Sequence, residues 1–428
     1  MSPHCEVAVI GAGMAGLSAA RALAEAGSRV VLLEARERVG GRIFSARSPD
    51  GTLVELGAEF VHGKPEPTLD LARDAGAILS PVSERHFAKH GPSFRESLDP
   101  WEPLRLVLQR SKHGEPDSSA QAFLERQGIA PETGERFRQL VEGFEAAPIA
   151  EVSIQSLAED SETLSKDDSQ FRIDGGYGQL VDYACQRALA AGVELRLSTA
   201  VAGVTWAERG PVSLQFEADR PRLEARRCVV AVPLGVLQAS PENQGIACHP
   251  PLAAWQPALA QLAMGHACRI VFSFGGSLAL KGVPPDAFIH NSTSLFETFW
   301  AQYSPGSCLW TAWAGGPKAS ELAKESAEQR QRLALGALAT LFDLPEARLR
   351  YMLRSVHQHD FSNDPRVRGA YSFCKPGGAK ASEALSSPLG GALFLAGEAT
   401  DHRYPGTVAG AIASGQRAAK QVLESLAR

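Results

Sequence analysis

The stretch CEVAVIGAGMAG, residues 5–16, decides the fold of this chain. Residues 5–10 form a short apolar run enriched in Val, which is typical of a buried parallel strand. Three glycines follow at once in the spacing G-x-G-x-x-G, at Gly11, Gly13 and Gly16. Gly11 permits a tight turn, Gly13 lets the backbone approach a pyrophosphate, and Gly16 lets a helix pack closely on the strand. This order predicts the phosphate-binding turn of a dinucleotide site.

The residues after the turn complete this unit. Residues 14–26 have the apolar spacing of a helix, and SRVVLLE, residues 28–34, predicts a second strand. The helix N-terminus, at Met14 and Ala15, offers N–H donors and partial positive charge to a phosphate. Glu34 ends the second strand, where a carboxylate can accept hydrogen bonds from a ribose diol. We therefore expect a Rossmann-type dinucleotide-binding domain.

The next residues, ARERVGGRIFS, add a second glycine turn. Ala35 and Arg36 follow the predicted ribose ligand directly, and Gly41 comes just before Arg42. A guanidinium on a close-approach turn suits a second contact to the pyrophosphate. The alternative is a basic surface loop.

The run E-A-R-x-R-x-G-G-R, residues 34–42, resembles the flavin-dependent amine oxidase family, which includes monoamine oxidases, polyamine oxidases and lysine-specific histone demethylases. The resemblance implies a two-domain α/β fold, with a Rossmann-type FAD-binding domain and a substrate domain whose mixed sheet is flanked by helices. It implies that an amine passes a hydride from its α-carbon to flavin N5, that the imine hydrolyses, and that O2 reoxidises the flavin to give H2O2.

The segment VELGAEFVHG resembles the family's segment that runs past the flavin ring toward the substrate. Gly57 and Ala58 are small enough for backbone to lie against a flat ring. Glu59, Phe60 and His62 are then expected in or near the cleft, with Glu59 and Phe60 also near the cofactor. His62 matches the His of the W-I-H-G-like motif that polyamine and spermine oxidases use in substrate binding. The alternative for His62 is a hydrogen-bonded loop residue.

Two later segments also resemble the family. A strand near Val201 implies a backbone contact with the adenine. MGHACRIVFSF places Arg269 where most of these enzymes have a Lys that assists reoxidation by O2. Arg269 is thus a candidate catalytic residue with several readings: an electrostatic role toward superoxide, a ligand for a substrate carboxylate, a sign that O2 is a poor acceptor, or a surface Arg at a strand end.

Aromatic residues are the other candidates for the substrate end. VRGAYSFCKPGG resembles the family's R-G-x-(Y/F)-S motif, which implies that Tyr371 belongs to an aromatic cage, with Phe373 as the backup. An aromatic face suits an amine or its alkyl chain. Trp300 lies in an aromatic-rich segment of which one or two rings are expected to line the cleft. The alternative for these rings is a place in the core.

The closing stretch LFLAGEATDHRYPGTVAGAIASG, residues 393–415, reads as a strand, a polar turn and a helix that begins near Thr407. The resemblance implies that this helix N-terminus faces flavin N1 and C2=O, where negative charge develops on reduction. The stretch lacks Cys, so we expect non-covalent FAD. Thr407 stands where many members have a second cage Tyr, which is closest to polyamine and spermine oxidases and suits a larger amine. The predicted contacts are Gly397, Glu398, Thr407, Val408 and Ala411.

Composition excludes several classes of function. A net charge of −5 and the lack of basic clusters give no sign of nucleic-acid binding. Seven dispersed Cys argue against a disulfide framework or structural zinc and favour a cytoplasmic protein. We expect no signal peptide and no membrane span, because no apolar run reaches about 18–20 residues. His357 and His359 have no third ligand nearby, so no metal site is predicted. The sequence does not indicate an oligomeric state.

A chain of 428 residues exceeds the roughly 250–300 residues of a single core, so two domains are expected. The FAD-binding domain is predicted at 1–79, 172–240 and 382–428. The substrate domain is predicted at 80–171, mainly helical with a charge-rich loop near its end, and at 241–381.

Two other functions remain open. One is a different enzyme of the same fold, namely an L-amino-acid oxidase or a dehydrogenase or desaturase. An amino-acid oxidase requires an Arg opposite the flavin, for which Arg269 is the candidate. The other is a flavoprotein with mainly a binding or scaffold role.

Overall fold

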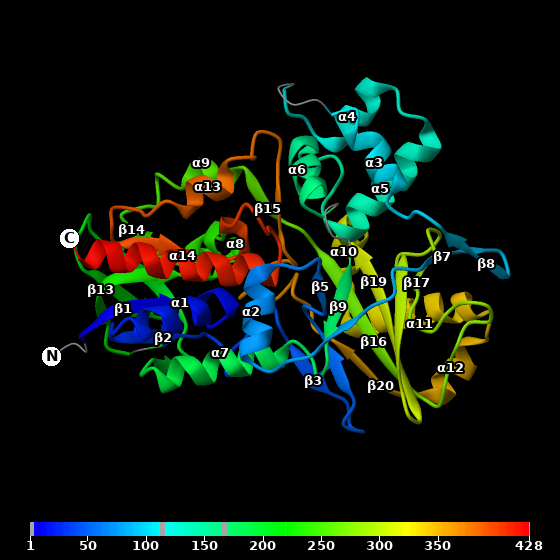
Figure 1. The fold of residues 1–428 in the computed structure, drawn as a ribbon, viewed down its shortest axis with the longest axis horizontal. Helices are drawn as coiled ribbons and strands as arrows, with labels where there is room; N and C mark the ends of the chain where they lie inside the picture. Colours follow the sequence, from blue (N-terminus) through cyan, green and yellow to red (C-terminus); the bar gives the residue numbers. More distant parts are fainter. Residues whose placement is uncertain (1–3, 112–115, 165–168, 219, 428) are drawn as a thin grey trace.

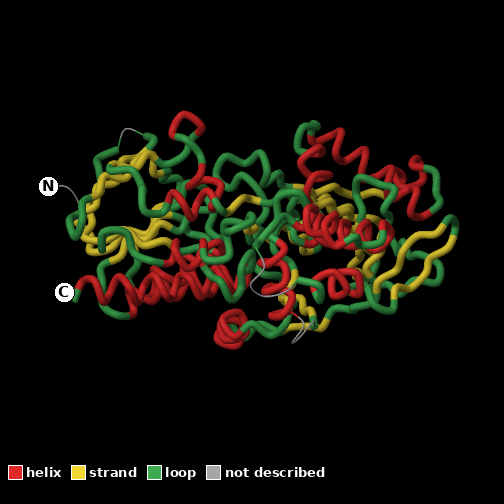
Figure 2. Tube along the Cα trace, turned by 90° about the horizontal axis from the view of Figure 1, so that it is seen from above, coloured by secondary structure: helices red, strands yellow, loops and turns green. Residues whose placement is uncertain are grey.

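Two large β-sheets lie toward opposite ends of an elongated molecule, and helices pack against both (Figure 1, Figure 2). The structure is a computed structural model that describes residues 4–111, 116–164, 169–218 and 220–427. The fold is α/β, as the sequence predicts. Within these ranges no helix combines the length and the apolarity that crossing a membrane requires.

The first sheet contains the glycine-rich unit. β1 (His4–Ile10) pairs in parallel with β2 (Val30–Leu33) and with β13 (Leu223–Val230), and β2 pairs in parallel with β10 (Glu194–Arg196). β2 is buried at every position, which explains its continuous apolar run. α1 (Met14–Glu25) begins directly after Gly13, as the glycine spacing predicts. The remaining strands of this sheet are β11 (Val201–Trp206), β12 (Val212–Phe216), β14 (Ala247–His249) and β22 (Leu393–Leu395).

Helices cover both faces of the first sheet. α1, α7 (Gly178–Ala190) and α14 (Val408–Leu426) share one apolar core with α2 (Glu66–Asp74). The opposite face packs against the short helices α8 (Leu234–Gln238), α9 (Gln256–Ala260) and α13 (Ala381–Ser386).

The two ends of the chain meet in this half of the molecule. β22 pairs in parallel with β13, and α14 runs beside α1, so the N- and C-termini lie at the same end in Figure 1. Gly415 lies at the closest approach of the two helices: a Cβ atom there would be 2.2 Å from the carbonyl oxygen of Ala15. The absence of a side chain at Gly415 is therefore what allows α14 to reach α1.

The second sheet is mixed, as predicted for the substrate domain. Its strands are antiparallel neighbours except for β17 and β7, which are parallel. α10 (Gly316–Leu322), α11 (Ala327–Phe342) and α12 (Glu346–Met352) contribute to its apolar core. The order across the sheet is β20 (Leu353–Gln358), β16 (Ala267–Gly275), β19 (Ser307–Gly315), β18 (Thr298–Ser304), β17 (Phe288–His290), β7 (His86–His90) and β8 (Ser93–Ser97).

The segment 80–171 is mainly helical, as expected, but it also contains strands. Its first part forms the β7–β8 hairpin, because β7 finds a partner in β17, about 200 residues away along the chain. The expected charge-rich loop at 159–170 is also corrected: its first residues belong to α6, and residues 165–168 lie outside the described residues. The helices of the segment gather in one corner of Figure 1: α3 (Glu102–Leu108), α4 (Ala120–Gln127), α5 (Pro131–Phe144) and α6 (Ile154–Leu164).

Small sheets connect the two large ones. Two of them pair segments that are distant in sequence: β5 (Phe60–His62) pairs with β9 (Gln170–Ile173), and β15 (Leu262–Met264) pairs with β21 (Ser372–Cys374). The predicted domain boundaries stay a prediction. The other short strands are β3 (Ser45–Arg47), β4 (Leu53–Glu55) and β6 (Leu79–Pro81).

Gly415→Ala is expected to destabilise the protein. An Ala in a helix interior is normally favourable, but this Cβ would overlap backbone of α1, so we expect a loss of about 1–3 kcal/mol in the free energy of unfolding. The matched control is Gly336→Ala in α11, where the nearest atom to an added Cβ is a side-chain oxygen at 3.8 Å. That change should stabilise by about 0.5–1 kcal/mol. Urea denaturation of both variants checks this, and a stabilised Gly415→Ala protein would contradict it.

Candidate active site

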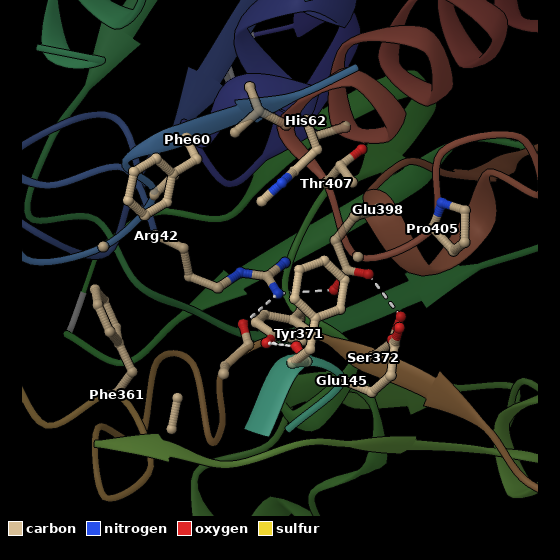
Figure 3. Close-up of a pocket in the computed structure, with 18 of the residues that line it drawn as sticks. Arg42, Phe60, His62, Glu145, Phe361, Tyr371, Ser372, Glu398, Pro405 and Thr407 are labelled. Atoms are coloured by element: carbon tan, nitrogen blue, oxygen red, sulfur yellow. Dashed lines mark hydrogen bonds and ion pairs between the residues drawn. The ribbon is translucent and has the colours of Figure 1, made fainter. Parts of the chain in front are cut away.

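One cavity of about 1080 Å³ is lined by residues from both large sheets and from the segment 80–171 (Figure 3). All the site residues predicted from the sequence line it except Gly16. Gly16 instead faces the turn before α1, where a Cβ would lie 1.8 Å from the carbonyl oxygen of Gly11. Its position fits the predicted role in helix–strand packing.

The glycine turns form one end of the cavity. Gly11 has φ +101°, and an added Cβ would lie 2.7 Å from the carbonyl oxygen of Ala231. A Cβ on Gly13 would meet no atom within 4 Å, which leaves open space above the start of α1. The second glycine turn lies against the first: Gly40 N–H donates to the Ala12 carbonyl at 2.8 Å, and Gly41 packs on Gly13. The two turns make a backbone cradle with room for a pyrophosphate.

Glu34 lies beside this cradle and is buried. One carboxylate oxygen accepts from the Ala12 N–H at 2.8 Å, and the other accepts from the Arg36 N–H at 3.0 Å. Each oxygen keeps a further acceptor site, as a ribose diol requires. The Arg36 side chain points to another partner, donating to Asp364 at 2.5 Å. Val201 is the first residue of β11 and also lines the cavity.

A chain of polar contacts crosses the middle of the cavity (Figure 3). Arg42 Nη1 donates to Glu398 Oε1 at 2.7 Å and to the Ala370 carbonyl at 2.9 Å. Ser372 Oγ donates to Glu398 Oε2 at 2.6 Å. The Glu398 side chain is 4% exposed and that of Arg42 is 25% exposed. The pair therefore holds a partly accessible guanidinium in a fixed direction, ready to meet a phosphate.

The start of α14 forms another part of the wall. Thr407 caps the helix: its hydroxyl accepts from the Gly410 N–H at 3.1 Å and donates to the Tyr404 carbonyl at 2.8 Å. Its hydroxyl is thus used by backbone, which limits its predicted contact with substrate to the methyl group. In the described residues the N–H groups of Val408 and Ala409 have no hydrogen-bond acceptor, and both residues line the cavity. They are available to stabilise negative charge there.

These residues fit the FAD predicted from the sequence. The open space at Gly13 and the acceptor sites of Glu34 suit a dinucleotide, and the free amides of α14 suit a ring that becomes negative on reduction. The neighbouring wall is formed by Gly57 and Ala58. A Cβ on Gly57 would lie 1.8 Å from the Arg42 carbonyl oxygen, so this segment is packed tightly from behind.

Glu59 and Arg269 form a buried ion pair in this wall, with side chains 2% and 7% exposed. Burial alone would raise the pKa of Glu59, but Arg269 and Arg172 outweigh it and hold the pKa below its usual value. Arg172 Nε donates to Glu59 at 2.6 Å, and Gln302 donates at 2.7 Å. Substrate binding by Glu59 stays a prediction, and these contacts favour a role in positioning Arg269.

His62, Tyr371 and Trp300 line the part of the cavity predicted to receive the substrate. Burial lowers the pKa of His62 to about 4, so the imidazole is neutral at neutral pH. The Tyr371 hydroxyl donates to the Phe144 carbonyl, and burial, with Glu145 nearby, raises its pKa. Trp300 donates to both oxygens of Glu59 at 3.2 Å, leaving its ring as an apolar wall. Phe373 is buried and lines the cavity.

The sequence did not reveal the contribution of the segment 80–171 and its partner strand. Glu145 and Asp160 line the cavity, and burial raises the pKa of both, each with a further increase from a neighbouring carboxyl. His86 and His290 also line it, stacked with ring centroids 5.1 Å apart and hydrogen-bonded at 2.8 Å. Only the pairing of β7 with β17 brings these two histidines together, and neither local pattern indicates it.

A family match accounts for this combination of cradle and cavity. Residues 14–423 match the family described as flavin containing amine oxidoreductase. The chain belongs to this family. It is therefore an enzyme of the flavin-containing amine oxidoreductases, as the motifs around Arg42 and Tyr371 imply.

Curated relatives of this amine oxidoreductase are distant. Lysine-specific histone demethylase 1B of Mus musculus is 27% identical over 454 residues, covering 97% of this chain and 52% of the relative. Lysine-specific histone demethylase 2 of Homo sapiens is also 27% identical, so the chain spans about half the length of these two relatives. Polyamine oxidase 4 of Oryza sativa subsp. japonica is 28% identical, covering 97% of this chain and 88% of the relative.

Solved structures of amine oxidases share the fold. Putrescine oxidase bound to putrescine has a TM-score of 0.79 at 21% identity, covering 99% of this chain and 100% of that chain. Cyclohexylamine oxidase from Brevibacterium oxydans IH-35A has a TM-score of 0.81 at 20% identity, and each chain is covered completely. At these identities the likeness establishes the fold of this amine oxidoreductase and leaves its substrate open.

Glu398→Gln is expected to weaken cofactor binding. Arg42 would lose the buried carboxylate that fixes the direction of its guanidinium. The dissociation constant of FAD should therefore rise about tenfold or more. FAD titration of the apoprotein, followed by fluorescence quenching, measures this. The matched control is Glu96→Gln, which breaks the ion pair with Arg85 at the surface. An equal effect of both substitutions would contradict the assignment.

Three histidines that line the cavity predict lability to acid. Burial lowers the pKa of His62 to about 4, of His86 to about 3, and of His290 to about 4, from 6.5. Between these values and pH 6.5 the unfolded chain binds protons that the folded protein does not. The free energy of unfolding should therefore fall as the pH decreases from about 6.5 to 4, by up to about 1.4 kcal/mol per pH unit for each histidine.

Urea denaturation at several pH values tests this dependence. His290→Gln should flatten the decline, because one such group is removed. The exposed His402 provides the control, and His402→Gln should leave the slope unchanged. A wild-type slope retained in His290→Gln would refute the assignment to this histidine.

Proposed function

We propose that this protein is an amine oxidase that holds FAD non-covalently and oxidises a primary or secondary amine, such as a polyamine, with O2 as acceptor. The observation that carries the proposal is that one cavity joins the dinucleotide cradle to a wall of aromatic rings and carboxyl groups. Family membership supports the flavin and the amine. A polyamine as substrate is supported by the polyamine oxidases among the relatives and by the similar fold of a putrescine oxidase that was solved with putrescine bound.

Bound FAD would supply the oxidising power, taking a hydride from the α-carbon of the amine and delivering two electrons and two protons to O2, which becomes H2O2. The nitrogen lone pair of the amine forms the C=N bond as the hydride leaves. Water then hydrolyses the imine to a carbonyl compound and releases the nitrogen as an amine or ammonia. This requires the amine to be neutral when it reacts.

The residues at the substrate end favour the neutral amine. His62 is an uncharged imidazole, so it does not repel an amine and can exchange hydrogen bonds with its nitrogen. The rings of Phe60, Tyr371 and Trp300 exclude water and accommodate the alkyl chain. Glu145 and Asp160 line the same cavity, and burial raises the pKa of both, which favours their uncharged form and leaves no strong counter-charge to hold the amine as an ammonium ion.

The contacts of Arg269 disfavour the amino-acid oxidase alternative. A ligand for a substrate carboxylate needs a guanidinium whose positive charge is not already neutralised by a carboxylate of the protein. Arg269 Nη1 donates to the Gly57 carbonyl at 2.9 Å, and Nη2 donates to Glu59. The geometry therefore supports an amine without an α-carboxylate over an amino acid.

A panel of amines tests the function. We expect anaerobic addition of a polyamine or monoamine to bleach the flavin absorbance, with H2O2 formed once O2 is admitted. L-Amino acids should have no such effect. If no amine in the panel bleaches the flavin, the proposal fails, and bleaching by amino acids alone would establish the alternative enzyme.

His62→Leu is expected to lower kcat/KM for the best amine by about tenfold or more, because the site loses its polar contact to the substrate nitrogen. The exposed His402→Leu serves as the matched control and should leave kcat/KM unchanged. FAD absorbance confirms that both variants are loaded. A His62→Leu enzyme with wild-type kcat/KM would exclude His62 from substrate binding.

A further inference from the structure

Glu59 is the centre of a buried cluster that draws on several strands. Its carboxylate accepts hydrogen bonds from Arg172 in β9, from Arg269 in β16, and from Trp300 and Gln302 in β18. With its side chain 2% exposed, these groups occupy its acceptor sites. Glu59 therefore acts on the cavity through its neighbours.

Arg269 is oriented by this carboxylate. One end of its guanidinium is fixed between Glu59 and the Gly57 carbonyl, while the buried Nε–H has no hydrogen-bond partner in the described structure. Leaving a buried donor unpaired costs free energy. The contacts with Glu59 and Gly57 offset that cost, so they determine where Arg269 lies.

The two arginines of the cluster differ in their exposure to water. The Arg172 side chain is 21% exposed and its residue does not line the cavity, whereas the Arg269 side chain is 7% exposed and its residue lines the cavity. Water therefore screens the charge of Arg172 more than the charge of Arg269. Of the two arginines in this cluster, Arg269 therefore contributes more to the electrostatic field in the cavity, and Glu59 contacts it directly.

We propose that Glu59 limits the positive charge that Arg269 presents to the cavity, and so lowers the reduction potential of the bound cofactor and slows its reoxidation by O2. This rests on the proposed function in one respect, namely that the cavity holds FAD. A cation near a group that gains negative charge on reduction favours the reduced form. A carboxylate in contact with that cation opposes the effect, so Glu59 is a positioning residue that tunes the cofactor through Arg269.

Glu59→Gln is the direct test, made on the FAD-loaded protein. The amide has the shape of the carboxylate and keeps an oxygen for Arg269, but it removes the negative charge. The midpoint potential should rise by about 30 mV or more, the shift that a tenfold change in a two-electron equilibrium produces. The rate constant for reaction with O2 should increase about tenfold.

The cofactor is reduced by light in the presence of EDTA, so the measurement needs no amine substrate. Failure to bind any amine would therefore leave this test intact. Dye-linked titration gives the potential, and stopped-flow mixing with O2 gives the rate constant. Glu59→Asp restores the charge and should return both values toward wild type.

A double-mutant cycle with Arg269→Met separates tuning from simple structural support. If Glu59 acts through Arg269, the effect of Glu59→Gln on the potential should vanish when Arg269 is Met. A potential that is unchanged or lower in Glu59→Gln would overturn the proposal. So would a rise of equal size in the Arg269→Met background.

Arg172→Gln provides a second variant in case Glu59→Gln does not fold. It removes the partly exposed cation, so the negative charge of Glu59 is then opposed by Arg269 alone. The midpoint potential of the cofactor and the rate constant for its reaction with O2 should both fall. The matched control is Arg85→Gln, which removes a surface arginine paired with Glu96. No difference between Arg172→Gln and this control would count against the proposal.

Discussion

Two helices, α1 and α14, begin at one cavity, and in the described part of the chain their first backbone N–H groups have no hydrogen-bond acceptor. The first turn of a helix has no internal acceptors for its amides, and burying them without a partner is unfavourable. Both helix starts line the cavity, although they come from opposite ends of the chain. Gly415 lets α14 approach Ala15 of α1 closely. The packing that joins the two ends of the chain therefore also places both helix starts at the cavity.

Local sequence patterns predicted the parts of the site that need a special backbone. Gly11 has a positive φ, and a Cβ there would lie 2.7 Å from the Ala231 carbonyl oxygen, while the bare backbone of Gly13 leaves open space at the start of α1. Glu34 follows the glycine turn at a predictable distance, because the helix and the strand that lie between the turn and Glu34 have standard lengths. The helix at Thr407 was predicted within one residue, because a polar turn gives way there to a run of small residues and the resemblance implies a helix start at this point. In each case the physical cause lies within a few turns of chain.

The rest depends on contacts between distant segments. The partners of Glu59 lie 113, 210, 241 and 243 residues away, so nothing near Glu59 indicated an ion cluster. Its position beside Phe60 and His62 suggested a substrate ligand instead. The same reason hid the β7–β8 hairpin, whose strand β7 is short and joins a sheet formed mostly by residues after 260. Register between strands of different segments is set by packing, which a local pattern does not report.

The cavity combines two electrostatic regimes, and their separation suits the proposed function, in which one site holds a charged cofactor and oxidises an uncharged amine. Arg42 and the backbone amides provide positive charge at the dinucleotide end, where phosphates need it. At the other end the charges are cancelled or suppressed: Arg269 is paired with Glu59, and His62 is neutral. Burial also favours protonated Glu145 and Asp160. An ammonium group that enters this nearly uncharged region loses its water and gains no counter-charge in return. The pKa of the amine is therefore lower there than in solution, which favours the neutral form.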